Sequence, residues 1–185
     1  VKQFSSDYGL VGGTAIALYL GHRRSIDFDL FTNVQLDNSA IRRQIRQYQE
    51  IQSVLSENPD ELTVVINSVK MTFFVYPFKI NYVTSFKEVI KLPDILTLGA
   101  MKIFALGKRA KWKDYVDLYF IFKEFKLKEV VAATKTIFSN EFNEKLAREQ
   151  LSYFEDIDYS EEIDYLPGFE MENDKIKDEL TKISL

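Results

Sequence analysis

The chain has 185 residues, of which 46% are apolar and 28% charged, and its net charge is −4. This length fits one domain with a real core, or one domain plus a helical appendage. The absence of cysteine and the single histidine exclude a disulfide framework, thiol chemistry and a multi-histidine metal site. Any bound metal would therefore have oxygen ligands, which favours magnesium or manganese over zinc.

No apolar run approaches the roughly 18–20 residues that span a bilayer, and no secretory signal is visible. We therefore expect a cytoplasmic protein with no membrane partner. The chain begins at Val1, close to its first motif, which indicates a trimmed N-terminus.

Charge is unevenly distributed along the chain. Residues 102–128 carry eight Lys or Arg against three acids, and residues 155–174 carry nine acids and no Lys or Arg. Solvated surface is one interpretation of both segments. Otherwise the basic segment suits phosphate or nucleic acid, and the acidic one suits a basic partner or the protein's own basic face.

The stretch from Tyr8 to Thr32 carries the clearest functional pattern. A Gly-Gly turn that opens a helix offers backbone N–H groups and the positive end of the helix dipole to an anion. In order, the pattern predicts a buried strand (Tyr8–Val11), a turn (Gly12 and Gly13), an apolar helix (Thr14–Leu20), a basic corner (His22, Arg23 and Arg24) and a strand (Ile26–Leu30).

Two aspartates in the last of these strands are candidate metal ligands. Asp27 and Asp29 share one face of a strand, because side chains alternate, while Ile26, Phe28 and Leu30 face the core. Adjacent carboxylates repel unless a positive charge lies between them, and a divalent cation with bound phosphates supplies one. Together with the Gly-Gly turn they predict a magnesium–nucleoside triphosphate site. Alternatively, alternation of this kind is typical of any half-exposed edge strand, and glycine turns are common.

The segment after Thr32 continues the sheet. Asn38 and Ser39 are helix-start signals, and the following helix carries Arg42, Arg43 and Arg46 on one face. Turn signals at residues 59–60 and 67–68 separate three extended segments into an antiparallel meander. The expected elements are a helix at 41–50 and strands at 51–56, 62–66 and 69–76, with a further short strand at 87–90.

From Pro93 onward the pattern is helical. Pro93 suits a first helical turn, and apolar residues then recur with the helical period. Residues 1–92 are therefore predicted to form an α/β (α+β) domain, a mixed sheet with flanking helices. Residues 93–185 form a helical C-terminal region packed on it. The expected helices span 94–108, 111–125, 127–138, 140–152 and 173–183.

A lysine and two aspartates lie on core-facing helices in this region. Lys102 is close to the apolar face of its helix, and Asp114 and Asp117 are three residues apart on another. Buried charges need partners, so a structural salt bridge is one interpretation. In the functional interpretation Lys102 neutralises triphosphate charge, and Asp114 orients the lysine or acts as a base on the attacking hydroxyl.

The two blocks LVGGTAIALYLGHRRSIDFDLFT and LGAMKIFALGKRAKWKDYVDLYFI resemble the AbiEii-type nucleotidyltransferase toxins. These belong to the DNA polymerase β-like superfamily and act in type IV, abortive-infection toxin–antitoxin systems. The resemblance covers roughly residues 8–125. It implies a nucleotidyltransferase fold, a magnesium (or manganese) cofactor, a nucleoside triphosphate substrate, a tRNA or protein acceptor and a cognate antitoxin. It implies triphosphate binding by Gly12, Gly13 and Thr14, metal binding by Asp27 and Asp29, and catalytic lysine and aspartate motifs at Lys102 and Asp114, with Asp117 a second candidate.

One departure from the superfamily concerns the metal site. A third carboxylate usually lies on a later strand, but the candidate strand Val69–Pro77 contains no acid. The first hypothesis is a nucleotidyltransferase in which Arg23, Arg24 and Lys102 stabilise the developing charge. The second is a catalytically degenerate member that binds nucleotide or antitoxin, and the third is a scaffold whose polar pairs are all structural.

Overall fold

The computed structural model describes residues 1–106 and 108–185. These residues form the predicted mixed α/β fold, with a seven-stranded sheet and seven α-helices. The chain divides into two compact units, residues 1–15 with 26–94 and residues 16–25 with 95–185. The predicted domain division after residue 92 stays a prediction, since compactness alone does not make an independent domain. Within the described residues, no helix is both long and apolar enough to cross a membrane.

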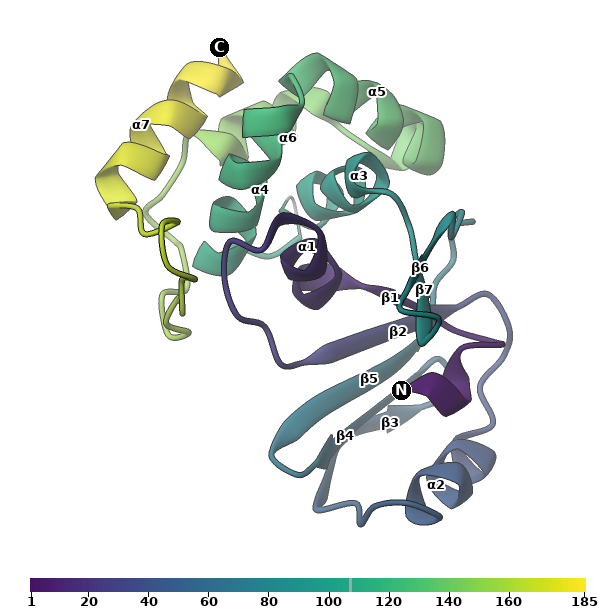
Figure 1. Cartoon of the computed structure of the whole chain (residues 1–185). Helices are drawn as coiled ribbons and strands as arrows, with labels where there is room; N and C mark the ends of the chain where they lie inside the picture. The colour runs from purple at the N-terminus through teal and green to yellow at the C-terminus, as the bar shows by residue number, and fades with distance from the viewer. Residues whose placement is uncertain (107) are drawn as a thin grey trace. The chain divides into compact units, whose positions relative to one another are not determined.

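The first unit contains the whole sheet, whose strand order is β3-β4-β5-β2-β1-β7-β6 (Figure 1). The β2–β5 and β1–β7 pairs are parallel and the remaining pairs antiparallel, so the expected meander of β3, β4 and β5 is present. The strands are β1 (Gly9–Val11), β2 (Phe28–Thr32), β3 (Ser53–Asn58), β4 (Glu61–Ile66), β5 (Val69–Val75), β6 (Thr84–Phe86) and β7 (Ile90–Leu92).

Alternation explains the core of this unit. Leu30, Leu62 and Phe73 are fully buried on neighbouring strands, as expected when one sheet face packs on apolar side chains. Helix α2 (Asn38–Arg46) buries Ile41 and Ile45. Its N-cap is Asp37, whose carboxylate accepts from the Ala40 N–H at 2.8 Å, rather than either predicted start residue.

Two sequence predictions in this unit were wrong in detail. Strand β2 begins at Phe28, so Ile26 and Asp27 both lie before it, and only Asp29 of the two aspartates belongs to the strand. Ile26 is 62% exposed instead of facing the core. Of the strand expected at 87–90, residues 87–89 form a tight turn between β6 and β7, and only Ile90 belongs to a strand. Lys87 and Glu88 both adopt positive φ there, and no strand continues through that conformation.

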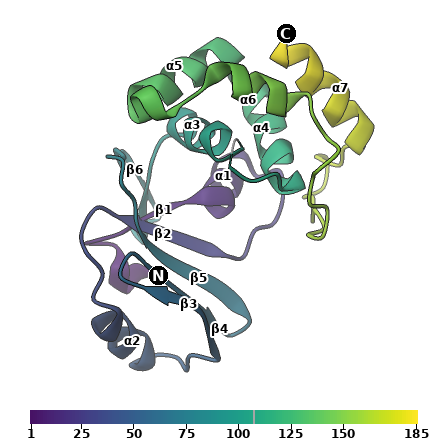
Figure 2. The ribbon, with the colours of Figure 1, turned by 180° about the vertical axis from the view of Figure 1, so that it is seen from behind.

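The second unit is helical (Figure 2). Helix α3 packs on α4 and α5, and the rings of Phe104 and Phe138 stack with centroids 3.8 Å apart. Helix α3 begins at Ile95, so Pro93 precedes it instead of lying in its first turn. The helix predicted from residue 140 starts at Glu144, because Asn143 caps it. The helices are α3 (Ile95–Leu106), α4 (Trp112–Glu124), α5 (Leu127–Phe138), α6 (Glu144–Leu151) and α7 (Asn173–Ser184).

Candidate active site

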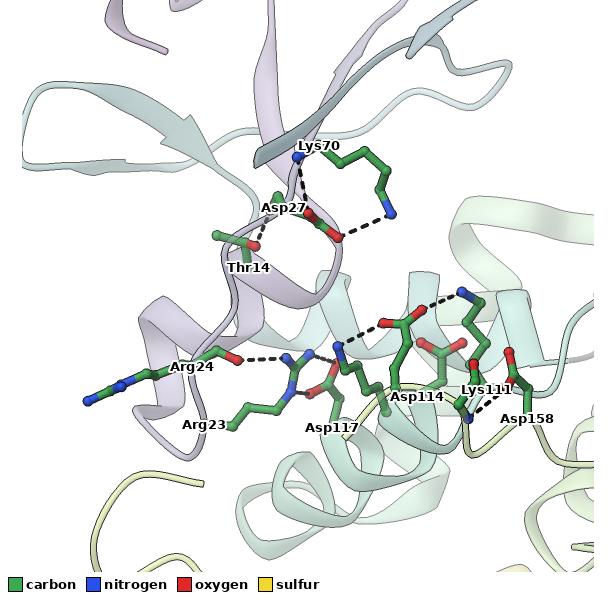
Figure 3. A network of polar contacts seen from close by, with 12 residues as sticks. Thr14, Arg23, Arg24, Asp27, Lys70, Lys111, Asp114, Asp117 and Asp158 are labelled. Carbon is green, nitrogen blue, oxygen red and sulfur yellow. Dashed lines mark hydrogen bonds and ion pairs between the residues drawn. The ribbon is translucent and has the colours of Figure 1, made fainter. Parts of the chain in front are cut away.

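Asp27 is held from two sides within the first unit (Figure 3). Its backbone carbonyl accepts a hydrogen bond from the Thr14 hydroxyl, in the first turn of α1 (Gly12–Leu20). Its carboxylate Oδ2 lies 3.1 Å from Nζ of Lys70 on β5, and Oδ1 accepts from the Lys70 backbone N–H at 3.3 Å. The structure therefore places a cation on this candidate metal ligand, a partner that the sequence analysis missed.

Asp29 lies against the start of α1. Gly12 has φ +71°, and a Cβ built on it would overlap Oδ2 of Asp29. Both the left-handed backbone and the close approach require glycine. The Gly-Gly turn thus brings the second candidate carboxylate beside the N-terminus of a helix that also offers Gly13 and Thr14 in its first turn.

On β5, the candidate strand for a third carboxylate, the residue opposite Asp29 is a threonine. In the sheet register Asp29 is opposite Thr72, and Thr72 is opposite Thr63. The Thr63 hydroxyl lies 3.3 Å from that of Thr72 and donates to Glu61 Oε1 at 2.9 Å. Across residues 1–106 and 108–185, no group of three or more His, Cys, Asp or Glu side chains is placed to hold a metal ion.

Two carboxylates nevertheless fit a magnesium ion. Mg²⁺ commonly takes one or two protein carboxylates, with water and substrate phosphates completing its coordination. Asp27 already attracts a cation, and Asp29 is kept close to the α1 N-terminus by a residue that has no side chain. The donor set therefore suits a metal that arrives together with phosphates.

The second unit contains a buried charge cluster that includes Asp114, Asp117 and Arg23 (Figure 3), and Lys102 contacts both aspartates. Only 6% of the Lys102 side chain is exposed, and its Nζ lies 2.7 Å from Asp114 Oδ1 and 3.1 Å from Asp117 Oδ2. Burial alone would lower the pKa of Lys102, but the two carboxylates outweigh burial and raise it above its usual value. The structure thus brings together the three residues of the second sequence motif.

Asp117 is the most highly coordinated member of this cluster. Besides Lys102, it accepts from Arg23 Nε at 2.8 Å and from Arg23 Nη2 at 3.0 Å. It also pairs with His22 Nε2 at 2.8 Å. Burial would raise the pKa of Asp117, but Lys102 and Arg23 hold it far below its usual value. Asp117 therefore stays ionised and fixes the side chains around it.

The predicted basic corner separates into two different environments. His22 is fully buried, its Nδ1 has no hydrogen-bond partner among the residues that the structure describes, and its ring centroid lies 4.9 Å from that of Phe120. Arg23 is also buried, whereas Arg24 is exposed and its guanidinium lies 3.6 Å from the Asp164 carboxylate. The histidine and the first arginine thus belong to the Asp117 cluster, and the second arginine belongs to the surface.

Arg109 completes the cluster on its solvent side, and the sequence analysis did not identify it. Its Nε lies 3.2 Å from Asp114 Oδ2, and 56% of its side chain is exposed. Two aspartates thus share Lys102, Arg23 and Arg109. The position of Arg109 in the basic run of residues 108–113 was the available signal, but a run alone does not say which cation reaches Asp114.

The acidic segment 155–174 packs back on the protein's own basic residues, one of the two partners considered for it. Glu161 contacts Lys111 at 2.6 Å and Lys113 at 2.7 Å. These lysines lower the pKa of Glu161 to about 2. The backbone also joins it to the Gly21–Arg24 loop, since Arg24 N–H donates to the Asp164 carbonyl at 2.8 Å.

Similar proteins define the class of this fold. A solved structure described as a "putative nucleotidyltransferase from H. pylori" has TM-score 0.55 and 16% identity, over 82% of this chain and 70% of that one. JHP933 from Helicobacter pylori has TM-score 0.51 and 17% identity, over 82% and 68%. The fold is that of a nucleotidyltransferase.

Sequence similarity then identifies the family. The model of the family described as "Nucleotidyl transferase AbiEii toxin, Type IV TA system" matches residues 3–182. The chain therefore belongs to the AbiEii nucleotidyltransferase toxin family, and the predicted resemblance and transferase class are confirmed. A protein described as "Uncharacterized protein aq_aa25" of Aquifex aeolicus (strain VF5) is 31% identical over 157 residues, 82% of this chain and 75% of that protein.

Proposed function

We propose that this nucleotidyltransferase transfers a nucleoside monophosphate from a magnesium-bound triphosphate to a hydroxyl group of RNA, with tRNA the first acceptor to test. The observation that carries the proposal is the contact between Gly12 and Asp29. It sets a carboxylate beside a helix N-terminus, so a metal ligand and an anion-binding helix end adjoin each other.

Asp27 and Asp29 would hold the metal, and the first turn of α1 would receive phosphate. The metal supplies charge neutralisation on the phosphate oxygens. We assign phosphate contacts to the backbone N–H groups of Gly12 and Gly13, since early helical N–H groups lack intrahelical acceptors. The Thr14 hydroxyl donates a hydrogen bond to the Asp27 carbonyl. In this proposal Thr14 therefore acts by holding the backbone of Asp27 in place.

The proposed reaction is a displacement at the α-phosphorus. The acceptor hydroxyl oxygen forms a new P–O bond, the bond from phosphorus to the bridging oxygen breaks, and pyrophosphate leaves. The hydroxyl proton passes to a carboxylate base. The family resemblance implies Asp114 for this role and Lys102 as a source of positive charge for the transition state.

The arginines take different roles in this proposal. Arg23 uses Nε and Nη2 on Asp117, so it holds the carboxylate that orients Lys102. Arg24 is exposed and weakly paired, so it is the arginine available to an anionic ligand. A cognate antitoxin is the partner that the type IV family suggests.

Transfer of α-labelled nucleotide tests the proposal. Each of the four triphosphates is incubated with Mg²⁺, the protein and total tRNA, beside the Asp27→Asn/Asp29→Asn double variant. Labelled RNA that disappears in the double variant is the expected result. Label that persists in the double variant would contradict the assignment of the metal ligands. Label on protein instead of RNA would contradict the assignment of RNA as the acceptor.

A degenerate, nucleotide-binding member of the same fold is the second candidate. It is favoured by the threonine pair Thr63 and Thr72 in place of a third carboxylate, and by Lys70, which neutralises Asp27. Magnesium-dependent triphosphate binding without transfer to tRNA or to protein would support this candidate over the enzyme.

A further inference from the structure

We infer that Lys70 is a built-in counter-cation of the metal site. It occupies Asp27 while the site is without metal, and it moves to the triphosphate when a divalent cation takes the carboxylate. This inference deepens the proposed function and rests on it. It concerns a residue of β5 that neither the family resemblance nor the sequence motifs assign.

The geometry separates the two oxygens of Asp27. Oδ1 accepts from the backbone N–H of Lys70 at 3.3 Å, and Oδ2 pairs with its Nζ at 3.1 Å. A divalent cation that approaches Oδ2 displaces only the ammonium group. The backbone hydrogen bond to Oδ1 remains, so Asp27 exchanges one cation for another without losing its position.

The ion pair is suited to exchange. The side chains of Asp27 and Lys70 are 39% and 40% exposed, and ion pairs this open to water contribute little to stability. A divalent ion shared with Asp29 gains the attraction of two carboxylates, whereas the ammonium pairs with one. The Lys102 pair, with 6% and 3% exposure, lacks this accessibility.

Lys70 also has the chemistry of a phosphate ligand. Lysine is a point charge on a flexible four-carbon stem, with three donors that can be redirected. Once released from Asp27, its ammonium stays close to the same carboxylate, because the Lys70 backbone N–H still donates to Asp27 Oδ1. A triphosphate bound through that metal would bring negative oxygens to it, and lysine is a common partner of such oxygens.

Binding of Mn²⁺ alone, measured by electron paramagnetic resonance, tests the first part of the inference, that Lys70 competes with the metal for Asp27. Lys70→Met retains the backbone N–H and removes only the ammonium. We expect it to bind Mn²⁺ about two- to fivefold more tightly than wild type, the range that an exposed ion pair provides. Lys70→Arg keeps a cation and should remain near the wild-type affinity, and Lys79→Met, at an exposed lysine of the same unit, should change nothing.

The second part of the inference, that Lys70 contacts the bound triphosphate, predicts an effect on triphosphate affinity opposite to the effect on Mn²⁺ affinity. With Mg²⁺ saturating, Lys70→Met should bind the donor triphosphate about tenfold more weakly, the loss of one charge-assisted hydrogen bond. Removal of a purely structural lysine would not strengthen the binding of Mn²⁺ and at the same time weaken the binding of the triphosphate. Unchanged Mn²⁺ affinity in Lys70→Met, with a wild-type melting temperature, would overturn the inference.

Failure of the inference is distinguishable from failure of the proposed function. If wild type and Asp27→Asn/Asp29→Asn bind Mn²⁺ equally, the proposed metal site is wrong and the inference falls with it. If the double variant loses Mn²⁺ and Lys70→Met does not differ from wild type, the metal site stands and only the role of Lys70 is rejected.

Discussion

Lys102 Nζ lies 2.7 Å from Asp114 Oδ1, and almost nothing of either side chain reaches solvent. The two residues come from different helices, α3 and α4, so their ion pair ties the two together. Asp117 supports the same lysine from one turn further along α4, at 3.1 Å. This arrangement serves stability and the proposed chemistry together, and the two contributions can be separated by substitution.

Lys102→Met should destabilise the fold by about 3 kcal/mol, because it leaves Asp114 and Asp117 buried with fewer cations. This value is at the lower end of the roughly 3–5 kcal/mol expected when one partner of a buried ion pair is removed, because Arg109 and Arg23 still contact these carboxylates. Urea unfolding at neutral pH measures it. A loss below 1 kcal/mol would contradict the view that the pair stabilises the second unit.

The matched comparison is Lys102→Met combined with Asp114→Asn. Removal of both charges should recover part of the stability lost in the single variant, because one of the two carboxylates left without Lys102 is gone. Transfer activity should not recover. Recovery of both would show that the pair is structural only.

The Lys102 cluster was predictable because its signal is local. Helical periodicity places Lys102 near an apolar face, and a spacing of three places Asp114 and Asp117 on neighbouring parts of one helix. The Asp27–Lys70 contact had no such signal. It depends on parallel pairing of β2 with β5, across 43 residues, and no local pattern encodes that choice of strand.

His22 shows the same limit. The sequence grouped it with Arg23 and Arg24 as a basic corner, since all three are consecutive. Its contact with Asp117 spans 95 residues, and burial rather than residue type separates it from Arg24.

The position of β2 was also ambiguous, because alternation fits a strand from Ile26 as well as one from Phe28. Only sheet pairing fixes where the strand begins.

The stability of the protein should fall in acid partly through Asp117. Its folded pKa is far below the unfolded value near 3.8. A depressed folded pKa contributes stability that is fully present above the unfolded pKa and is lost as pH falls towards the folded one. The difference in unfolding free energy between wild type and Asp117→Asn should be constant from about pH 5 to 8 and should shrink below about pH 4.

Urea unfolding at several pH values measures this difference. Asp178→Asn, at an exposed aspartate of α7, is the control and should differ from wild type by a constant amount throughout. If the Asp117→Asn difference is as large at pH 3 as at pH 7, another carboxylate dominates the acid transition.

Gly12→Ala should abolish metal binding, because the new methyl group would displace the Asp29 carboxylate. Gly21→Ala is the matched control. Gly21 has a similar φ of +63°, but nothing lies within 4 Å of a Cβ built there. Each substitution therefore carries the backbone cost, about 1–3 kcal/mol, and only Gly12→Ala disturbs a carboxylate.

Mn²⁺ titration and thermal unfolding of the two alanine variants separate these effects. Equal loss of stability with metal binding lost only in Gly12→Ala is the expected result. Retention of Mn²⁺ binding by Gly12→Ala would show that Asp29 does not need its place against the start of α1.

The acidic segment 155–174 should be released when Glu161 loses its charge. Glu161→Gln weakens the contacts to Lys111 and Lys113, which are partly exposed and individually weak. The segment has no Lys or Arg, so chymotrypsin, which can cut after Tyr159 and Tyr165, is the suitable protease. Cleavage should become about two- to fivefold faster, while global stability changes by less than about 1 kcal/mol.

Salt and a neighbouring variant make this last test specific. High salt screens exposed ion pairs, so the difference between wild type and Glu161→Gln should disappear at about 1 M salt. Glu162→Gln removes the adjacent charge from an exposed side chain and should leave cleavage unchanged. If both variants are cleaved faster by the same factor, the overall negative charge of the segment, and not the Glu161 contacts, holds it in place.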